Sequence, residues 1–377
     1  MRIVYFSAGC TVHDRRFLGA IAAVGHQVFF LRLQGGLLPA DSEPLRAGVE
    51  AVAWRRTAEP ATAFAELAAL APDLQSALAR LAPDVVHAGP VQSCAFVAAL
   101  AGAHPLLVQS WGSDLLVDAD RDPLWRWASR FTLRRSDALF CDCDAVRAKA
   151  RELAGYADSA IVQFPWGVDL ERFAPGGARD ARRQWGWEQN FVVLSTRNWE
   201  PIYGTATLLE AFARAHHREP RLRLALLGTG SLQPQIQAFL RERGLEDAVR
   251  CPGAVSHRLL LEHFAAADLY LSCATSDGTS VSLLEAMASG LPVVVTDAPG
   301  NREWVAPGEN GWLARAGDAG SFAQALLEAA SSGERLQAMG ERNRRVAEQR
   351  ADFHANFPKL LHTYERLRTA RAASGRD

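Results

Sequence analysis

Short apolar runs alternate with longer amphipathic segments along the first half of the chain. The runs have the length of buried strands, and the segments between them repeat apolar residues at the three-and-four spacing of a helix. The predicted strands are residues 1–9, 27–33, 84–87, 105–110, 138–141 and 160–163. The predicted helices are residues 15–25, 61–81, 91–100, 125–135 and 145–153. This alternation indicates parallel βαβ units, so we expect one doubly wound α/β domain over residues 1–165.

The rhythm stops over residues 166–190, which we interpret as a linker, and it restarts at residue 191. The predicted strands of the second half are residues 191–195, 222–227, 249–251, 269–273 and 291–295. The predicted helices are residues 207–216, 232–243, 259–265, 281–289, 320–330 and 333–349, with a last helix at 353–368. We therefore expect a second doubly wound domain over residues 191–350, followed by a C-terminal helical segment at 351–377. Ligands of such sheets bind at the carboxyl ends of the strands, so two domains facing across a cleft are predicted to bind them there.

Composition narrows the class of protein. The chain has 377 residues, 49% hydrophobic and 22% charged, which is typical of a globular protein of about two domains. A net charge of −1 gives no general attraction to nucleic acid, and no nucleic-acid partner is expected. The sequence contains no apolar stretch of about 20 residues and does not begin like a signal peptide. Six cysteines show neither metal nor disulfide spacing, so the predicted location is the cytoplasm.

One stretch, residues 276–297, carries two acids eight positions apart. Asp277 precedes the predicted helix 281–289 and Glu285 lies inside it. The loop between Asp277 and the helix is Gly278, Thr279 and Ser280, and a helix N-terminus favours anions. Capping of the helix by Ser280 is the alternative, and both roles are compatible. An acid within an apolar helix needs a polar partner if it is buried, and a ligand rich in hydroxyls would supply one.

With two further motifs, this stretch carries a resemblance to a known family. Residues 166–173 read WGVDLERF and residues 111–114 read WGSD. The chain resembles the retaining GT-B glycosyltransferases of family 4, the glycosyl transferases group 1. Asp277 and Glu285 are similar to that family's E-x7-E motif, with Asp277 in place of the first Glu. The resemblance implies an α/β GT-B fold: two Rossmann-like domains, acceptor-binding then donor-binding, with the C-terminal helix crossing back to the first.

The resemblance implies an activity as well. It implies transfer of a hexose-type sugar from a nucleotide-diphosphate sugar, such as a UDP-sugar, to an acceptor hydroxyl. The acceptor would be a glycan, a lipid-linked glycan or a small molecule, as in polysaccharide biosynthesis. Retention at the anomeric carbon is implied, with no metal or other cofactor. A nucleotide-sugar epimerase on the same fold and a non-catalytic sugar-nucleotide-binding protein are the alternatives.

Arg197, Asp277 and Glu285 take roles in the donor site by resemblance. Arg197 follows the predicted strand 191–195 and would grip the diphosphate through two N–H groups; the alternative is a surface Arg capping the sheet. Glu285 would bind the ribose hydroxyls, and Asp277 would contact the donor sugar, one methylene short of the family geometry.

The family's Lys, about five residues after the Arg, is missing from this sequence. Tyr203, before Gly204, sits one place beyond it and offers one neutral hydrogen bond. Either the phosphate is stabilised less, or Arg15 or Arg16 of the first domain substitutes.

Three further positions complete the predicted donor-binding set. Gly228 opens a loop after a strand, with a plain structural turn as the alternative. Val255 follows another strand, where the family backbone often meets the nucleobase. Gly9 follows the first strand and permits close approach of a ligand to the backbone.

The predicted acceptor site begins in the loop after the first strand, with His13, Asp14 and Arg15. The alternative is a solvated loop in which Asp14 caps the following helix. At the carboxyl end of the strand 84–87, His87 is a further acceptor candidate, with a purely structural histidine as the alternative.

The WGSD loop supplies two more candidates. Trp111 stands where many family members carry a His, and it would form an apolar wall for a sugar ring. Asp114 is assigned to the catalytic set, with capping of the next turn as the alternative.

The predicted helix 125–135, WRWASRFTLRR, mixes four Arg with aromatic residues. Such a helix suits an anionic membrane surface, and a peripheral contact with the cytoplasmic membrane face follows from that interpretation. We prefer the alternative, in which the aromatic side faces the core and the basic side is solvated.

Overall fold

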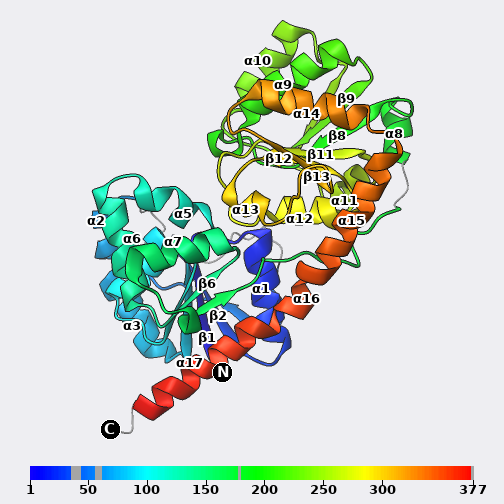
Figure 1. Cartoon of the computed structure of the whole chain (residues 1–377). Helices are drawn as coiled ribbons and strands as arrows, with labels where there is room; N and C mark the ends of the chain where they lie inside the picture. The colour runs from blue at the N-terminus through cyan, green and yellow to red at the C-terminus, as the bar shows by residue number, and fades with distance from the viewer. Residues whose placement is uncertain (35–43, 56–61, 177–179, 375–377) are drawn as a thin grey trace. The chain divides into compact units, whose positions relative to one another are not determined.

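The computed structural model describes residues 1–34, 44–55, 62–176 and 180–374 (Figure 1). The chain divides into two compact units. The first consists of Met1–Phe164 and Asn356–Asp377, and the second of Pro165–Ala355. The boundary between them lies one residue before the predicted one. The C-terminal segment returns to the first unit.

A parallel sheet of seven strands forms the centre of the first unit, in the order β3-β2-β1-β4-β5-β6-β7. Its strands are β1 (Arg2–Ser7), β2 (Gln27–Arg32), β3 (Val49–Ala51), β4 (Val85–Gly89), β5 (Leu106–Gln109), β6 (Ala138–Cys141) and β7 (Ile161–Gln163). The strand order runs outward from β1 in both directions, which is the doubly wound topology. The sequence predicted six of these strands and missed β3, whose three residues include the exposed Glu50 and no fully buried side chain.

Helices cover both faces of this sheet, and the alternation of side chains along β1 shows which helices cover which face. The longer helices are α1 (Val12–Ala23), α2 (Phe64–Ala69), α3 (Ala71–Leu81), α4 (Phe96–Leu100), α6 (Pro123–Arg135), α7 (Asp144–Ala154) and α17 (Pro358–Ser374). The shorter ones are η1 (Val91–Ala95), α5 (Ser113–Leu116), η2 (Asp118–Asp120) and η3 (Asp158–Ala160). Val4 and Phe6 join the core beneath α3, α4, α6 and α7, while Tyr5 points to the face that α17 covers. Residue 61, where the helix predicted at 61–81 begins, lies outside the described residues. The structure has two helices in this range, α2 and α3, which are separated at Leu70.

The second unit repeats the plan with six parallel strands in the order β10-β9-β8-β11-β12-β13. Its strands are β8 (Phe191–Ser195), β9 (Leu222–Leu227), β10 (Val249–Gly253), β11 (Leu269–Ser272), β12 (Val293–Thr296) and β13 (Gly311–Ala314). Strand β12 begins two residues later than predicted, because Pro292 has no N–H to donate to the sheet. The sequence missed β13. The α/β doubly wound fold is confirmed for both units.

Two cores lie on the two faces of this second sheet. One packs α9, α10 and α14 against the strands, and the other packs α11, α12 and α15 against the opposite face. The helices are α8 (Asp180–Trp185), η4 (Pro201–Tyr203), α9 (Thr205–Arg218), α10 (Gln233–Arg243), α11 (His257–Ala266), α12 (Val281–Ala288), α13 (Pro299–Arg302), α14 (Ala319–Ala330), α15 (Glu334–Arg350) and α16 (Phe353–Asn356). The predicted helix 353–368 is broken before Pro358, where α16 ends and α17 begins.

Helix α17 packs on the first sheet, against β4, β6 and β7. Tyr364 of this helix is buried, and its hydroxyl lies 2.6 Å from Nδ1 of His87 on β4. The His87 side chain is 1% exposed and packs edge-on against Tyr5. This position does not support the acceptor role predicted for His87 and agrees with the structural alternative, because the imidazole has no surface to offer a substrate.

The burial of His87 predicts a pH-dependent stability. Burial lowers the pKa of His87 from 6.5 to about 3, so the folded protein holds the neutral imidazole. As pH falls below 6.5 the unfolded chain takes up this proton and the folded chain does not, which weakens folding by about 1.4 kcal/mol per pH unit. Between about pH 7.5 and about pH 5 we expect the wild type to lose about 2 kcal/mol more than His87→Gln. Urea unfolding of both proteins at a series of pH values measures this difference, and parallel curves would contradict it.

Candidate active site

The site is centred on Arg197, two residues beyond the carboxyl end of β8. Its Nη2 lies 2.9 Å from Oδ2 of Asp277, and the two side chains are 14% and 20% exposed. Its Nη1 donates to the hydroxyls of Ser280, at 2.7 Å, and Ser282, at 3.1 Å. The guanidinium carbon also lies 4.2 Å from the centre of the Tyr203 ring. The structure therefore brings together Arg197, Asp277, Tyr203 and Ser280, which were predicted from separate segments.

These contacts lie at the N-terminus of α12. Ser280 caps this helix, with its side chain accepting from the Leu283 N–H at 3.4 Å, as the capping alternative predicted. The Thr279 hydroxyl accepts from Nε1 of Trp304 at 3.2 Å, and Thr279 and Ser280 are both buried. The positive end of the helix dipole and a guanidinium thus meet at one point, which is a suitable place for an anion.

Glu285 lies further along the same helix and is half-buried. It stands three residues after Ser282, so both share one face of α12. The structure therefore places the Glu285 side chain on the same face of α12 as Ser282, which contacts Arg197. This is the order of the predicted donor contacts, with the diphosphate at Arg197 and the ribose at Glu285.

Glycines allow the surrounding loops to cross closely. A Cβ on Gly228, at φ +121°, would lie 2.6 Å from the Arg197 carbonyl oxygen. A Cβ on Gly204, at φ +65°, would lie 2.0 Å from the Cys273 carbonyl oxygen, and one on Gly300 would lie 2.1 Å from that of Gly278. Gly228 therefore agrees with the structural alternative, since it packs its loop against the backbone of Arg197. Sequence reasoning missed Gly300 because its requirement comes from a segment distant in the chain.

The charges of Arg197 and Asp277 largely compensate each other. Burial raises the pKa of the Asp277 carboxyl, and Arg197 acts against that rise. Burial opposes the charged form of Arg197, but the charge and hydrogen bond of Asp277, together with Tyr270 and Tyr203, outweigh it and raise the guanidinium pKa. Tyr203, near the position of the missing Lys, contributes a ring face to Arg197 and no charge. The substitution of the missing cation by Arg15 or Arg16 stays a prediction.

Val255 and Gly9 lie in loops at the carboxyl ends of their sheets. Val255 is half-buried between β10 and α11, and the Gly253 carbonyl before it accepts from the Gly228 N–H at 3.0 Å. No heavy atom lies within 4 Å of a Cβ built on Gly9, so the space beside its backbone is open.

The helix that follows the first strand begins earlier than predicted, and this changes the predicted acceptor loop. Helix α1 begins at Val12, so His13, Asp14 and Arg15 lie in its first turn and not in a loop. Thr11 is the N-cap, accepting from the Asp14 N–H at 3.2 Å, while Asp14 Oδ2 accepts from the Thr11 N–H at 2.7 Å. Asp14 is therefore the third helical residue of a capping box and not the cap itself, and it is buried. His13 and Arg15 are half-buried.

Asp114 is buried and surrounded by hydrogen-bond donors. Its Oδ1 accepts from the Ser110 hydroxyl at 2.6 Å, the Trp111 N–H at 3.1 Å and the Leu115 N–H at 2.9 Å. Its Oδ2 accepts from the Val91 N–H at 3.1 Å. These bonds fix the loop and agree with the capping alternative, so the structure does not support the catalytic role predicted for Asp114. Trp111 is half-buried in the loop that Asp114 holds.

Over the described residues, no helix combines the length and the apolarity needed to cross a membrane.

The close approach of Gly204 to the Cys273 carbonyl predicts that one added methyl group at residue 204 will strongly destabilise the fold. Gly204→Ala adds a left-handed backbone strain and a clash with the Cys273 carbonyl, so we expect a loss of unfolding free energy on the order of 2–4 kcal/mol. Gly244, at φ +63° in the same unit, has no atom within 4 Å of its Cβ position. Gly244→Ala is therefore the matched control and should lose only about 1–2 kcal/mol from backbone strain. Chemical denaturation of the two variants checks this, and equal losses would exclude the clash.

Two family models match this chain, one largely within each of the two units. Residues 8–167 match the model of the glycosyl transferase 4-like domain, and residues 178–346 match that of the glycosyl transferases group 1. The chain is 26% identical over 236 residues to the putative glycosyltransferase EpsD of Bacillus subtilis, covering 60% of this chain and 61% of that protein. It is 30% identical over 216 residues to D-inositol 3-phosphate glycosyltransferase 2 of Catenulispora acidiphila, covering 55% and 51%. The matches thus span about half to three fifths of these relatives' lengths.

Solved structures share the fold. Sucrose-phosphate synthase of Thermosynechococcus elongatus superposes with a TM-score of 0.83 at 19% identity, covering 98% of this chain and all of that one. Anabaena HepE in complex with UDP superposes with a TM-score of 0.76, also at 19% identity, covering 97% of this chain and all of that one. The two domain models together span both units of the molecule. The chain belongs to the group 1 glycosyl transferases of the GT-B fold.

Proposed function

We propose that this protein transfers a sugar from a nucleotide-diphosphate sugar to an acceptor hydroxyl, with retention at the anomeric carbon. The observation that carries the proposal is the convergence of Arg197 and the N-terminus of α12. Departure of a diphosphate develops negative charge, and aimed cations and N–H groups stabilise it. The acceptor is a hydroxyl of a glycan, a lipid-linked glycan or a small molecule.

One buried donor of Arg197, in the loop after β8, supports a ligand at this point. The Nε of Arg197 has no hydrogen-bond partner among the described residues. Buried donors without partners are uncommon in folded proteins. A small adjustment of this loop around a bound diphosphate would supply acceptors for such groups.

Asp277 has a double role in the proposal. One carboxylate oxygen holds Arg197, and the other is left to accept a hydroxyl of the donor sugar. Glu285 binds the ribose hydroxyls further along α12. The network then orients the donor while Arg197 supports the leaving group.

The transfer proceeds on one face of the sugar. The bond from the anomeric carbon to the phosphate oxygen breaks, and the acceptor oxygen bonds to the same face of that carbon. The acceptor proton moves to the departing phosphate oxygen, so no protein nucleophile is required. No metal takes part in this scheme.

UDP-sugars are the first donors to examine. HepE structures contain UDP, UDP with glucose, and UDP-glucose. A relative from Mycolicibacterium smegmatis, 27% identical over 65% of this chain, is GDP-mannose-dependent by name. The base therefore has to be tested directly.

A thermal-shift screen against UDP-, GDP-, ADP- and CMP-sugars tests the donor class. One donor should raise the melting temperature, because ligand at a hundred times its dissociation constant stabilises the fold by about 2.7 kcal/mol. The screen and a subsequent transfer assay with acceptor panels contain EDTA, and both are expected to succeed with it. A requirement for added Mg²⁺ would contradict the metal-free scheme. An epimerised nucleotide sugar formed without acceptor, or binding with no transfer at all, would contradict the proposed activity.

Substitutions separate the roles within the donor site. Glu285→Ala should raise the donor dissociation constant by roughly ten- to a hundred-fold, since charged hydrogen bonds are lost. Arg197→Ala should lower kcat/KM by about a hundred-fold or more, and Tyr203→Phe by only about two-fold. Calorimetry and initial rates measure these effects.

Controls distinguish chemistry from unfolding. Removal of Arg197 leaves Asp277 without its partner, so Arg197→Lys, which keeps the charge but loses the planar fork, is measured beside it. Glu262→Ala on α11 removes a carboxylate outside this network and should leave donor affinity unchanged. Equal losses from Arg197→Ala and Tyr203→Phe would assign the phosphate to Tyr203.

A further inference from the structure

Helix α6 exposes apolar side chains on the surface of the first unit. The described part of the chain has six large hydrophobic side chains that are well exposed, and three of them lie between residues 117 and 127. They are Val117, 42% exposed, Leu124, 52% exposed, and Trp127, 51% exposed. The aromatic side of this helix was predicted to face the core, and Trp127 does not conform to that prediction.

The exposed Trp127 stands on a rigid aromatic base. Its ring stacks on Phe131 at 5.3 Å between centroids and meets Phe96 of α4 edge-on at 6.0 Å. Phe96 packs in turn against Phe64 of α2 at 5.4 Å. The base holds the outer ring in position, so an apolar surface is presented without further ordering of the side chain.

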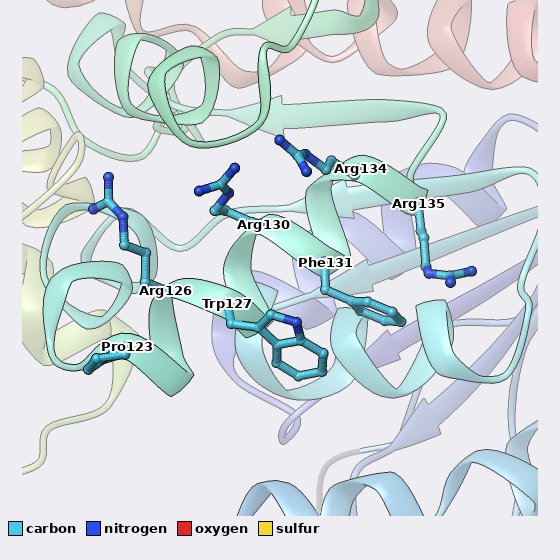
Figure 2. A pocket seen from close by; sticks show the side chains of 7 residues that line it. All are labelled: Pro123, Arg126, Trp127, Arg130, Phe131, Arg134 and Arg135. Atoms are coloured by element: carbon cyan, nitrogen blue, oxygen red, sulfur yellow. The ribbon is translucent and has the colours of Figure 1, made fainter.

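A row of arginines runs beside these rings. Arg126, Arg130 and Arg134 follow one another at four-residue spacing. In Figure 2 they project upward from α6 while Trp127 and Phe131 project downward, and both sets line the same groove. Arg126 is paired with Asp120 and, at 2.9 Å, with Glu152. Arg130, Arg134 and Arg135 form no ion pair with any residue that the structure describes, and Arg135 lies 4.5 Å above the Phe131 ring.

We propose that α6 docks on the surface of a membrane containing anionic phospholipids. The seven side chains that line the groove along α6 are Pro123, Arg126, Trp127, Arg130, Phe131, Arg134 and Arg135. A helix of this kind inserts its aromatic side between headgroups while its cations meet the lipid phosphates. Three unpaired arginines complement a negative surface, and each contributes roughly five-fold to binding near such a surface.

The neighbouring aliphatic side chains favour lipid over nucleic acid. Leu124 and Val117 gain nothing from a sugar–phosphate backbone, whereas acyl chains remove both from water. The net charge of −1 over the whole chain gives no general attraction to a negative surface, so the attraction has to come from a local patch such as this helix. The proposal goes beyond sugar transfer, since it requires neither the donor nor the acceptor to be bound.

Vesicle co-sedimentation of the full chain tests the proposal. Vesicles of phosphatidylcholine with added phosphatidylglycerol should bind the protein, and vesicles of phosphatidylcholine alone should not. Raising the salt from about 0.05 M to about 0.5 M should release it, because screening shortens the reach of the charges. The combined change Arg130→Gln, Arg134→Gln and Arg135→Gln should weaken binding on the order of a hundred-fold.

A matched variant controls for net charge. Arg218, Arg241 and Arg345 are exposed residues of the second unit, and their combined change to Gln alters the net charge equally. It should leave vesicle binding within about two-fold of the wild type. Circular dichroism and donor binding confirm that both triple variants are folded.

Insertion of Trp127 gives a second, independent readout. Lipids brominated along the acyl chain should quench part of the tryptophan emission, and Trp127→Phe should remove that part. Leu124→Ser should weaken binding, whereas Leu259→Ser, an exposed leucine elsewhere, should not.

Four outcomes overturn the proposal. They are no binding to anionic vesicles, equal losses in the two triple variants, binding without any quenching of Trp127, and tighter binding of a single-stranded RNA that the Arg130, Arg134 and Arg135 changes abolish. The last outcome would assign the surface to nucleic acid.

Discussion

The ion pair between Arg197 and Asp277 is the interaction around which the carboxyl end of the second sheet is arranged. Two charges taken from water are tolerable only if each has a partner and further hydrogen bonds. Here Ser280 and Ser282 supply those bonds. Because Ser280 is the N-cap of α12 and Ser282 lies in its first turn, the pair fixes where that helix begins relative to β8. The close crossings at Gly204 and Gly228 bring the loops near enough for the pair to form. The same charge compensation leaves the site less positive than an isolated Arg would make it. In the proposed function, binding of a diphosphate therefore relies more on the helix N-terminus.

Periodicity predicted the fold well because buried parallel strands are apolar on both faces. It failed for β3 and β13, two edge strands whose larger side chains are only partly buried, so neither shows a clear apolar run. In the donor site, motif resemblance predicted Arg197, Asp277, Tyr203 and Ser280 as neighbours, and their contacts follow. In the first unit, burial decides the outcome and is not visible in the sequence. His87 and Asp114 carry polar groups typical of active sites, yet the His87 ring is buried with its Nδ1 against Tyr364, and the Asp114 carboxylate is occupied by internal hydrogen bonds. The capping box of Thr11 and Asp14 was present as a sequence signal and shows why the helix starts earlier than its apolar period suggests.

The two proposals rest on different units and on different physics. The donor site concentrates a few partly buried charges whose geometry is fixed by backbone crossings. The surface of α6 spreads unpaired charges and exposed rings along one helix, where solvent screening makes each contact weak and only their number gives affinity. A site such as the donor site selects a ligand by its shape, whereas a surface such as that of α6 determines where the protein binds.

The return of the chain to the first unit has a consequence for how the protein is made. The hydrogen bond between His87 and Tyr364 joins residues 277 positions apart, with the whole second unit between them in the chain. During synthesis the sheet of the first unit is complete by residue 164, but the face that α17 covers stays uncovered until residues 358–374 have left the ribosome. The second unit has all its strands before then and is free to fold first. The first unit is therefore finished after the second one, and until then a nascent chain exposes the apolar face around Tyr5 and His87.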